Sequence, residues 1–383
     1  MTQAVSPETQ NVDLTPKLDH EDVERVKVDV ASQWQLMWWK FKRHKMAMVG
    51  GVVVIAYYLV ALFANFFAPV HFQTYRAEYV YAPPQRIRLF LDGKFTPYVF
   101  GYTFERDPVS FKKTWAIDES VVIPVGFLQH GEAYKLWGII PGDLHLIGPK
   151  NADDPFYLLG SDKSGRDVFS RIIYSSRISL TVGLVGVVIS LGLGILIGGL
   201  SGLVGGLLDN LIQRLIEILI SIPTLPFWLA LAAAVPLDWS PLQVYFMITI
   251  ILSLIGWTGL GRVVRSKFLA LREEDFILAA TLDGVPRGRM ILRHMIPSFL
   301  SHIIASVTLA IPGMILGETA LSYLGLGLRP PVVSWGVMLK DAQSIRVIAN
   351  MPWMLLPGAA VSITVLVFNF LGDGLRDAAD PYH

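Results

Sequence analysis

The sequence has no cysteine, few charged residues and almost no net charge. The absence of cysteine excludes disulfides and thiolate chemistry. Charged residues make up 16% of the 383 residues, whereas soluble domains have about a quarter. A net charge of +1 gives no support for nucleic-acid binding. Because hydrophobic residues make up 53% of the chain, we predict a membrane protein that lies in a lipid bilayer and binds no nucleic acid.

The motifs of several enzyme classes are also missing from the sequence. It contains no phosphate-binding loop G-x-x-x-x-G-K-[ST], no G-x-G-x-x-G and no H-E-x-x-H. The eight histidines are scattered, and no two of them have ligand spacing on one expected helix, so we expect no metal site. No serine lies in a nucleophile elbow or triad context. We therefore predict a chain that is not a catalyst and binds no cofactor itself.

Six apolar runs are long enough to cross a bilayer, which needs about 20 residues. They lie at about 46–69, 178–203, 212–234, 243–262, 299–324 and 352–371. Four basic residues precede the first run: Lys40, Lys42, Arg43 and Lys45. This is the pattern of an uncleaved signal anchor whose N-terminus is cytoplasmic, and six spans then place both termini in the cytoplasm. The basic connection between 261 and 293 also falls inside, in agreement with the positive-inside rule.

The chain divides into four parts on this topology. Residues 1–33 are polar and predict a disordered or loosely attached cytoplasmic tail. Residues 34–69 contain the cytoplasmic flank and the first span, and residues 158–383 contain a five-helix core. Residues 70–157 lie outside, and their stretches PYVFGYTF and SVVIPVGFL are typical of strands. A small extracytoplasmic subdomain is favoured there, and a lid packed on a partner or a docking surface is the alternative.

Small residues recur every four positions in the second run, namely Ser190, Gly194, Gly198, Gly202 and Gly206. At helical spacing they form one smooth stripe that lets another helix approach closely. We favour helix packing within the same subunit, while a subunit contact or a pore lining stays open.

Ionisable residues inside membrane spans are costly and usually have a role. Arg214 and Glu217 are three residues apart near the start of the third run, so they can pair on one helix face. Glu318 lies in GMILGETALSYLGLG, near the outer end of the fifth run. It could line a gate or a translocation path. The favoured alternative is that Glu318 caps backbone amides or pairs with an arginine of a neighbouring helix.

The stretch ILAATLDGVPRGRMILRHMIPSFL, residues 277–300, is a polar and turn-broken helix pair between two apolar runs. Ala279 and Ala280 allow very close packing at the centre of its first helix. Gly284 permits a chain reversal, and Pro286 suits the first turn of the next helix. We therefore predict a short helix that lies across the inner membrane surface and is presented to a cytosolic partner.

This stretch resembles the EAA loop of ABC importer permeases, whose pattern is E-A-A, three residues, Gly, nine residues and I-x-L-P. The two alanines, the glycine and the proline match at the right spacing, whereas Leu278, His294 and Ile296 replace the other three residues. The resemblance implies that about residues 272–297 form a coupling loop, which docks in a groove of an ATPase subunit. Its implied docking residues are Leu278, Ala279, Ala280, Asp283, Gly284, Arg287 and Pro297.

Three further stretches are similar to C-type permeases of dipeptide and oligopeptide importers. They are LGSDKSGRDVFSRIIYSSRISLTVGL, GETALSYLGLGLRPPVVSWGVMLKDAQ and MLLPGAAVSITVLVFNFLGDGLRDAADP. The resemblance implies an all-α integral membrane protein with the six-helix type I ABC importer permease fold, in the bacterial cytoplasmic membrane. It also implies a B-type permease partner, two ATPase subunits that hold ATP and magnesium, and an extracytoplasmic solute-binding protein. The insertion at 70–157 is much longer than in most members.

The resemblance implies that the substrate is a dipeptide or oligopeptide. An oligosaccharide is the alternative, because the aromatic-rich insertion would suit sugar stacking. A secondary transporter or channel is the alternative from another class. It would need inverted repeats, broken helices at the midplane or a line of ionisable residues, and the sequence shows none of these.

Overall fold

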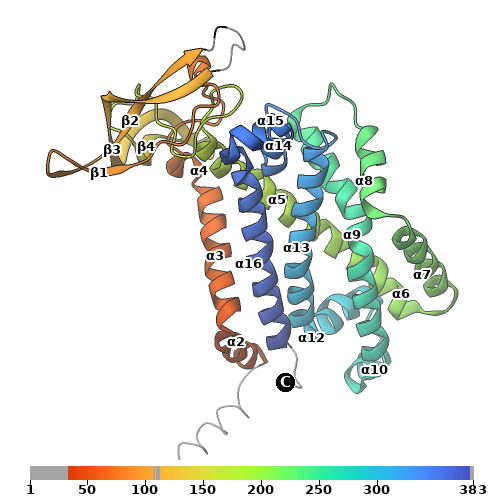
Figure 1. Cartoon of the computed structure of the whole chain (residues 1–383). Helices are drawn as coiled ribbons and strands as arrows, with labels where there is room; N and C mark the ends of the chain where they lie inside the picture. The colour runs from red at the N-terminus through yellow and green to blue at the C-terminus, as the bar shows by residue number, and fades with distance from the viewer. Residues whose placement is uncertain (1–32, 107, 109–112, 380–383) are drawn as a thin grey trace, which may run out of the picture.

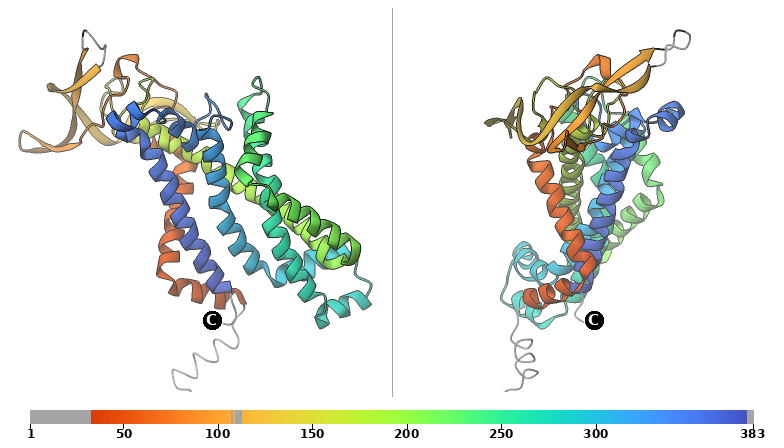
Figure 2. Two further views of the ribbon diagram at one scale, coloured as in Figure 1. Left: turned by 45° about the vertical axis from the view of Figure 1, so that its right-hand side comes forward. Right: turned by 60° about the vertical axis from the view of Figure 1, so that its left-hand side comes forward.

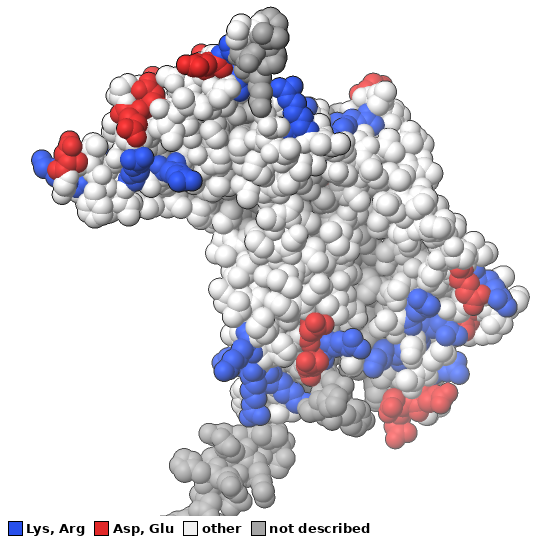
Figure 3. Space-filling model, in the orientation of Figure 1, with Lys and Arg blue, Asp and Glu red and all other residues white. Residues whose placement is uncertain are grey.

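The protein is a helical bundle with a β-sheet subdomain at one end (Figure 1). The computed structural model describes residues 33–106, 108 and 113–379, so the predicted tail at 1–33 lies almost wholly outside the described residues. Charged side chains gather at the two ends of the bundle and leave a broad uncharged band between them (Figure 3). Five helical segments of the described chain are long and apolar enough to span a membrane: α3 (Lys45–Leu62), α5 to α6 (Val168–Val204), α9 (Pro241–Leu271), α13 (Leu300–Tyr323) and η4 to α16 (Pro352–Ala379).

The third predicted span, 212–234, is not one continuous helix. The chain forms α7 (Gly206–Ser221) and α8 (Thr224–Ala233), which meet at 86°. Pro223 has no N–H to continue the helix, and it holds Ile222 in an extended conformation with φ −80° and ψ 128°. The described chain therefore has five spanning helices, or six if this bent pair crosses the membrane as one span.

The second span is a single long rod with a local irregularity. It consists of α5 (Val168–Leu193), the π-turn η2 (Gly194–Gly198) and α6 (Gly199–Val204). The last span begins with η4 (Pro352–Leu355) and continues as α16 (Leu356–Ala379). The main core lies where α5, α9 and α13 meet, and its fully buried side chains include Leu180, Ile248, Leu252, Ile315 and Trp335.

The two ends of the bundle carry different structures, and we call them the sheet end and the loop end. The sheet end carries the β-sheet, α14 (Trp335–Asp341) and α15 (Ile345–Asn350), and the loop end carries α2 (Gln33–Arg43) and α10 (Asp275–Leu282) (Figure 1 and Figure 2). Phe41 and Ala47 pack with Ala378, near the end of α16. Both ends of the described chain therefore lie at the loop end.

Residues 70–157 contain a four-stranded antiparallel sheet, inserted between the first two spans of an otherwise helical chain. The strands are ordered β1 (Arg88–Leu91), β2 (Lys94–Arg106), β3 (Lys113–Leu136) and β4 (Ile140–Pro149). PYVFGYTF lies in β2, and SVVIPVGFL lies in β3. The sheet has its own small core of Val99, Ile123, Val125 and Phe156. Two short elements connect it to the first span, α4 (Ala64–Phe67) and η1 (Ala77–Tyr79).

Candidate coupling site

The predicted coupling loop is a compact helical turn at the loop end. After α10 come α11 (Arg287–Met290), η3 (Ile291–Met295) and α12 (Ile296–Ser298), which lead into α13. Gly284 has φ 72°, a conformation that strains any residue with a Cβ. Its N–H donates to Thr281 O at 3.1 Å, and the Val285 N–H donates to Ala280 O at 3.1 Å. These two bonds form a Schellman motif, which explains why a glycine here ends α10 and reverses the chain.

One face of this loop packs on the bundle, and the other is open. The packed side chains join Val264 and Phe268 of α9 in one apolar cluster, and they are Ile277, Ala280, Met290 and Met295. Ala280 therefore packs inside this chain. The other six predicted docking residues are exposed: Leu278, Ala279, Asp283, Gly284, Arg287 and Pro297. Leu282 on the same face is 89% exposed. An exposed apolar patch beside charged residues is typical of a protein-interaction surface.

A polar cluster joins α7 to α9 close to this loop. Arg265 Nε and Nη2 donate to Asp209 Oδ1 and Oδ2, each at 2.5 Å, in a bidentate ion pair. Ser201 Oγ also donates to Asp209, and Gln213 Nε2 donates to Ser201 Oγ at 3.1 Å. Arg265 is one helical turn from Phe268, which packs on the loop. We did not predict this pair, because its partners are 56 residues apart and the only signal was an aspartate between two apolar runs.

Three of the four stripe glycines lie where the second span crosses α9. A Cβ on Gly198 would lie 2.2 Å from Gly261 O, and a Cβ on Gly194 would lie 3.1 Å from Gly261 N. Gly202 also lies against α9, because Arg265 O is 2.9 Å from its Cβ position. Gly206 is not part of this contact. The helix breaks before it, and nothing lies within 4 Å of its Cβ position.

The two predicted ionisable sites within the spans differ in environment. Arg214 and Glu217 form the predicted pair at 2.7 Å on an exposed helix face. Glu318 is fully buried, and its Oε1 accepts hydrogen bonds from the hydroxyls of Ser322 and Ser334, each at 2.7 Å. The expected partners, backbone amides or an arginine, are thus replaced by two serine hydroxyls. In this conformation Glu318 joins α13 to the start of α14 and lines no open path.

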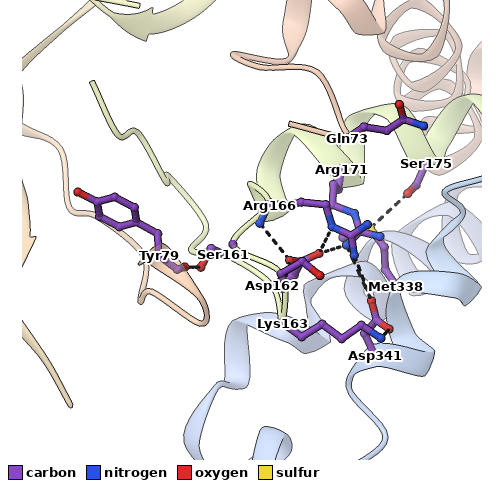
Figure 4. Close-up of polar contacts among 12 residues, drawn as sticks. Gln73, Tyr79, Ser161, Asp162, Lys163, Arg166, Arg171, Ser175, Met338 and Asp341 are labelled. Carbon is purple, nitrogen blue, oxygen red and sulfur yellow. Dashed lines mark hydrogen bonds and ion pairs between the residues drawn. The ribbon is translucent and has the colours of Figure 1, made fainter. Parts of the chain in front are cut away.

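A buried charged cluster holds the LGSDKSGRD stretch at the sheet end (Figure 4). Asp162 is fully buried, and its Oδ2 accepts from Arg166 Nε at 2.7 Å and from Arg171 Nη1. Asp341 of α14 joins the cluster through Lys163 Nζ at 2.8 Å. The cluster therefore ties the segment before α5 to α14. Among the described residues, no group of three or more histidine or acidic side chains could hold a metal ion.

Several aromatic residues of the sheet subdomain pack against one another around Trp115. Trp115 lines two open hollows of about 430 and 480 Å³. Tyr79 stacks on its ring with centroids 5.8 Å apart and planes at 12°, and Tyr102 and Phe104 contact it edge-on. Lys113 Nζ lies 5.6 Å from the ring centroid. These contacts show that Trp115 acts as packing within the subdomain.

Two family models match the chain on either side of the sheet subdomain. Residues 194–382 match the binding-protein-dependent transport system inner membrane component. Residues 32–84 match the N-terminal TM domain of oligopeptide transport permease C. The chain belongs to the family of inner-membrane components of binding-protein-dependent transport systems, and it is a permease subunit of an ABC importer. Within that family it is of the C type.

The relatives include three peptide permeases. The chain is 38% identical to a peptide permease protein of Brucella ovis over 251 residues. This alignment covers 65% of this chain and 81% of that protein. It is 40% identical to the oligopeptide transport system permease protein OppC of Haemophilus influenzae, over 62% of this chain and 75% of that protein. It is 41% identical to the dipeptide transport system permease protein DppC of Alkalihalophilus pseudofirmus, over 58% of this chain and 71% of that protein. Among solved structures, an inward-facing MetNI methionine ABC transporter aligns with a TM-score of 0.40 and 16% identity, over 54% of this chain and 95% of that chain.

Proposed function

We propose that this chain is the permease subunit of an importer that moves dipeptides or oligopeptides across the bacterial cytoplasmic membrane. The names of its OppC and DppC relatives support the peptide substrate. The loop end would face the cytoplasm, because the basic residues that flank the first span and those of the coupling loop lie there. Both termini would then be cytoplasmic, and the sheet subdomain would face outside.

The observation that carries the mechanism is the two-faced coupling loop. Its exposed face, with Leu278 and Leu282, would dock in a groove of an ATPase subunit. Its buried face, with Ile277 and Met290, is packed on α9. ATP and magnesium would bind only to the two ATPase subunits. When these subunits close, the push on α10 would pass to α9 and rotate the core as a rigid body between inward- and outward-open states.

Two further partners complete the proposed transporter. A B-type permease subunit would form a heterodimer with this chain, and an extracytoplasmic solute-binding protein would deliver the substrate. The family description, binding-protein-dependent transport, supports the second partner. The names of the OppC and DppC relatives favour a peptide over the oligosaccharide alternative, and the uptake test below compares the two substrates directly. A secondary transporter or channel does not fit membership of this family.

The assembly is tested by purifying the tagged protein in mild detergent and identifying its partners by mass spectrometry. We expect a second permease and one or two ATPases that carry a phosphate-binding loop. In Leu282→Asp, the ATPases should be lost while the second permease is retained. Ile345→Asp at the sheet end is the matched control, because Ile345 is 86% exposed and should leave the ATPases bound. A lone homo-oligomer would contradict the proposal.

Coupling and substrate are tested with the reconstituted complex. Gly284→Ala places a Cβ on a residue with φ 72°, at a cost of roughly 1–2 kcal/mol. We expect it to reduce peptide uptake per ATP hydrolysed without loss of subunits. Gly288→Ala is the control, because Gly288 has helical geometry and open space around its Cβ position. Equal uptake in both variants would argue against coupling at this turn. Labelled tripeptide and labelled oligosaccharide are then compared as substrates.

A further inference from the structure

The β3–β4 hairpin of the sheet subdomain reaches the end of a membrane-spanning helix. At its turn Trp137 has φ 52° and Gly138 has φ 76°, as in a type I′ turn. Trp137 Nε1 donates to Leu62 O at 3.0 Å, and the Trp137 ring lies 5.6 Å from the ring of Phe63. Leu62 is the last residue of α3. The tip of the hairpin therefore lies at the level where the first span ends.

The tip of this hairpin is apolar and uncovered. Trp137 is 48% exposed, Ile139 80% and Ile140 49%. Lys135 is the only charged residue between 135 and 141. Beside the tip, α3 presents an apolar outer face that includes the exposed side chain of Leu62. The apolar surface of the hairpin thus continues the surface through which α3 faces lipid.

The backbone of the tip is also suited to a medium without water. The Gly138 N–H donates to Lys135 O at 3.1 Å, and the Ile139 N–H donates to Leu136 O at 3.0 Å. The indole N–H of Trp137 is satisfied by α3. Polar groups of this kind must be paired before a segment can enter a bilayer.

We propose that the β3–β4 hairpin tip inserts into the membrane leaflet at the sheet end and anchors the sheet subdomain there. Trp137 lies at the level of the headgroups, where amphipathic rings gather. Ile139 and Ile140 contact the acyl chains, and the Lys135 stem extends its ammonium toward the headgroups. Lipid is the occupant because the tip adjoins the lipid-facing side of α3 and shares its depth. The subdomain is thereby held at a defined height above the bilayer.

The test uses the natural absence of cysteine, which allows a single spin label to be placed on the chain. Ile139→Cys is labelled in the assembled transporter in lipid nanodiscs, and Ile140→Cys provides a second position on the tip. Thr114→Cys is the control, because it is exposed and lies at the opposite end of β3 from the hairpin tip. Power-saturation EPR then compares collisions with oxygen, which enters lipid, and with a nickel chelate, which stays in water.

We expect the oxygen-to-nickel accessibility ratio to be several-fold higher at 139 and 140 than at 114. Accessibility to nickel at 139 equal to that at 114 would place the tip in water and overturn the proposal. Protection from both reagents would show that a protein partner covers the tip, and it would overturn the proposal as well. A labelled protein that retains its bound ATPases shows that the chain is folded in each case.

Discussion

Arg265 on α9 and Asp209 on α7 form a bidentate ion pair with two bonds of 2.5 Å. The pair ties the bent helices α7 and α8 to the span that leads into the proposed coupling loop. Neutralising one partner leaves the other charge in a buried or partly buried place without its ion-pair partner, at a cost of about 1–3 kcal/mol. We therefore expect Asp209→Asn and Arg265→Gln each to lower the midpoint of thermal unfolding of the purified permease.

The double variant Asp209→Asn with Arg265→Gln distinguishes this pair from two independent sites. If the two side chains act as a unit, the double variant should unfold at a temperature no lower than that of the less stable single variant, because neither charge is then left without its partner. Additive losses would show that each residue contributes through other contacts.

Gly198 and Gly192 provide a matched test of helix packing on one span. An alanine Cβ at Gly198 would lie 2.2 Å from Gly261 O, whereas nothing lies within 4 Å of the Cβ position of Gly192. We expect Gly198→Ala to destabilise the permease by about 1–3 kcal/mol through overpacking. Gly192→Ala should be neutral or slightly stabilising, since alanine favours a helix. Thermal unfolding in detergent measures both, and equal stabilities would contradict the close contact with α9.

Substitutions at Glu318 test whether this residue stabilises the fold or lines the translocation path of the substrate. Glu318→Ala removes the acceptor of two buried serine hydroxyls, which costs about 1–3 kcal/mol. Glu318→Gln keeps an acceptor and should be milder. Uptake should then fall in proportion to the amount of folded permease in both variants. If Glu318→Gln changed the preference among peptide substrates at an unchanged folded amount, Glu318 would instead act on the substrate.

Asp167 makes stability depend on pH. Burial raises the pKa of this carboxyl, the N-cap of α5, from 3.8 to about 6, despite its hydrogen bond from the Ser170 N–H. Between these values the folded protein binds a proton that the unfolded chain releases. The free energy of unfolding is therefore highest below the lower value. It falls by about 3 kcal/mol as pH rises from the lower value to the upper one, and it no longer changes with this group above the upper value.

The variant Asp167→Asn removes this dependence and keeps an N-cap. We expect its midpoint of thermal unfolding to exceed that of the unsubstituted protein at neutral pH and to approach it in acid, near the pKa of the unfolded carboxyl. Parallel pH profiles for the two proteins would show that Asp167 does not titrate in this window.

Several features of this protein were predictable because their causes are local in the chain. A bilayer core requires a continuous apolar run, so the positions of α3, α9, α13 and α16 follow from composition alone. The reversal after α10 follows from Gly284, since few other residues tolerate a positive φ. The strands at 97–104 and 120–128 were also apparent from their residue types.

Other features depend on which faces of distant elements meet. Pro223 is visible in the sequence, but the 86° bend that accompanies it is a property of the packed helices. Glu318 was recognisable as a buried ionisable residue, yet its partner Ser334 is 16 residues away and its own helix ends between them. The pair of Asp209 and Arg265 and the contact of Gly198 with Gly261 join helices across the bundle.

The sequence by itself determined that this is a membrane permease of the C type, with a glycine-ended helical turn between two spans and a β-rich insertion. Only the tertiary structure decided that Ala280 faces inward, that Glu318 binds two serines and that Trp137 reaches the end of α3. The physical reason is that turn chemistry and membrane partition act on residues near one another in the chain. Buried polar pairing and helix contact depend on surfaces that exist only after the chain has packed.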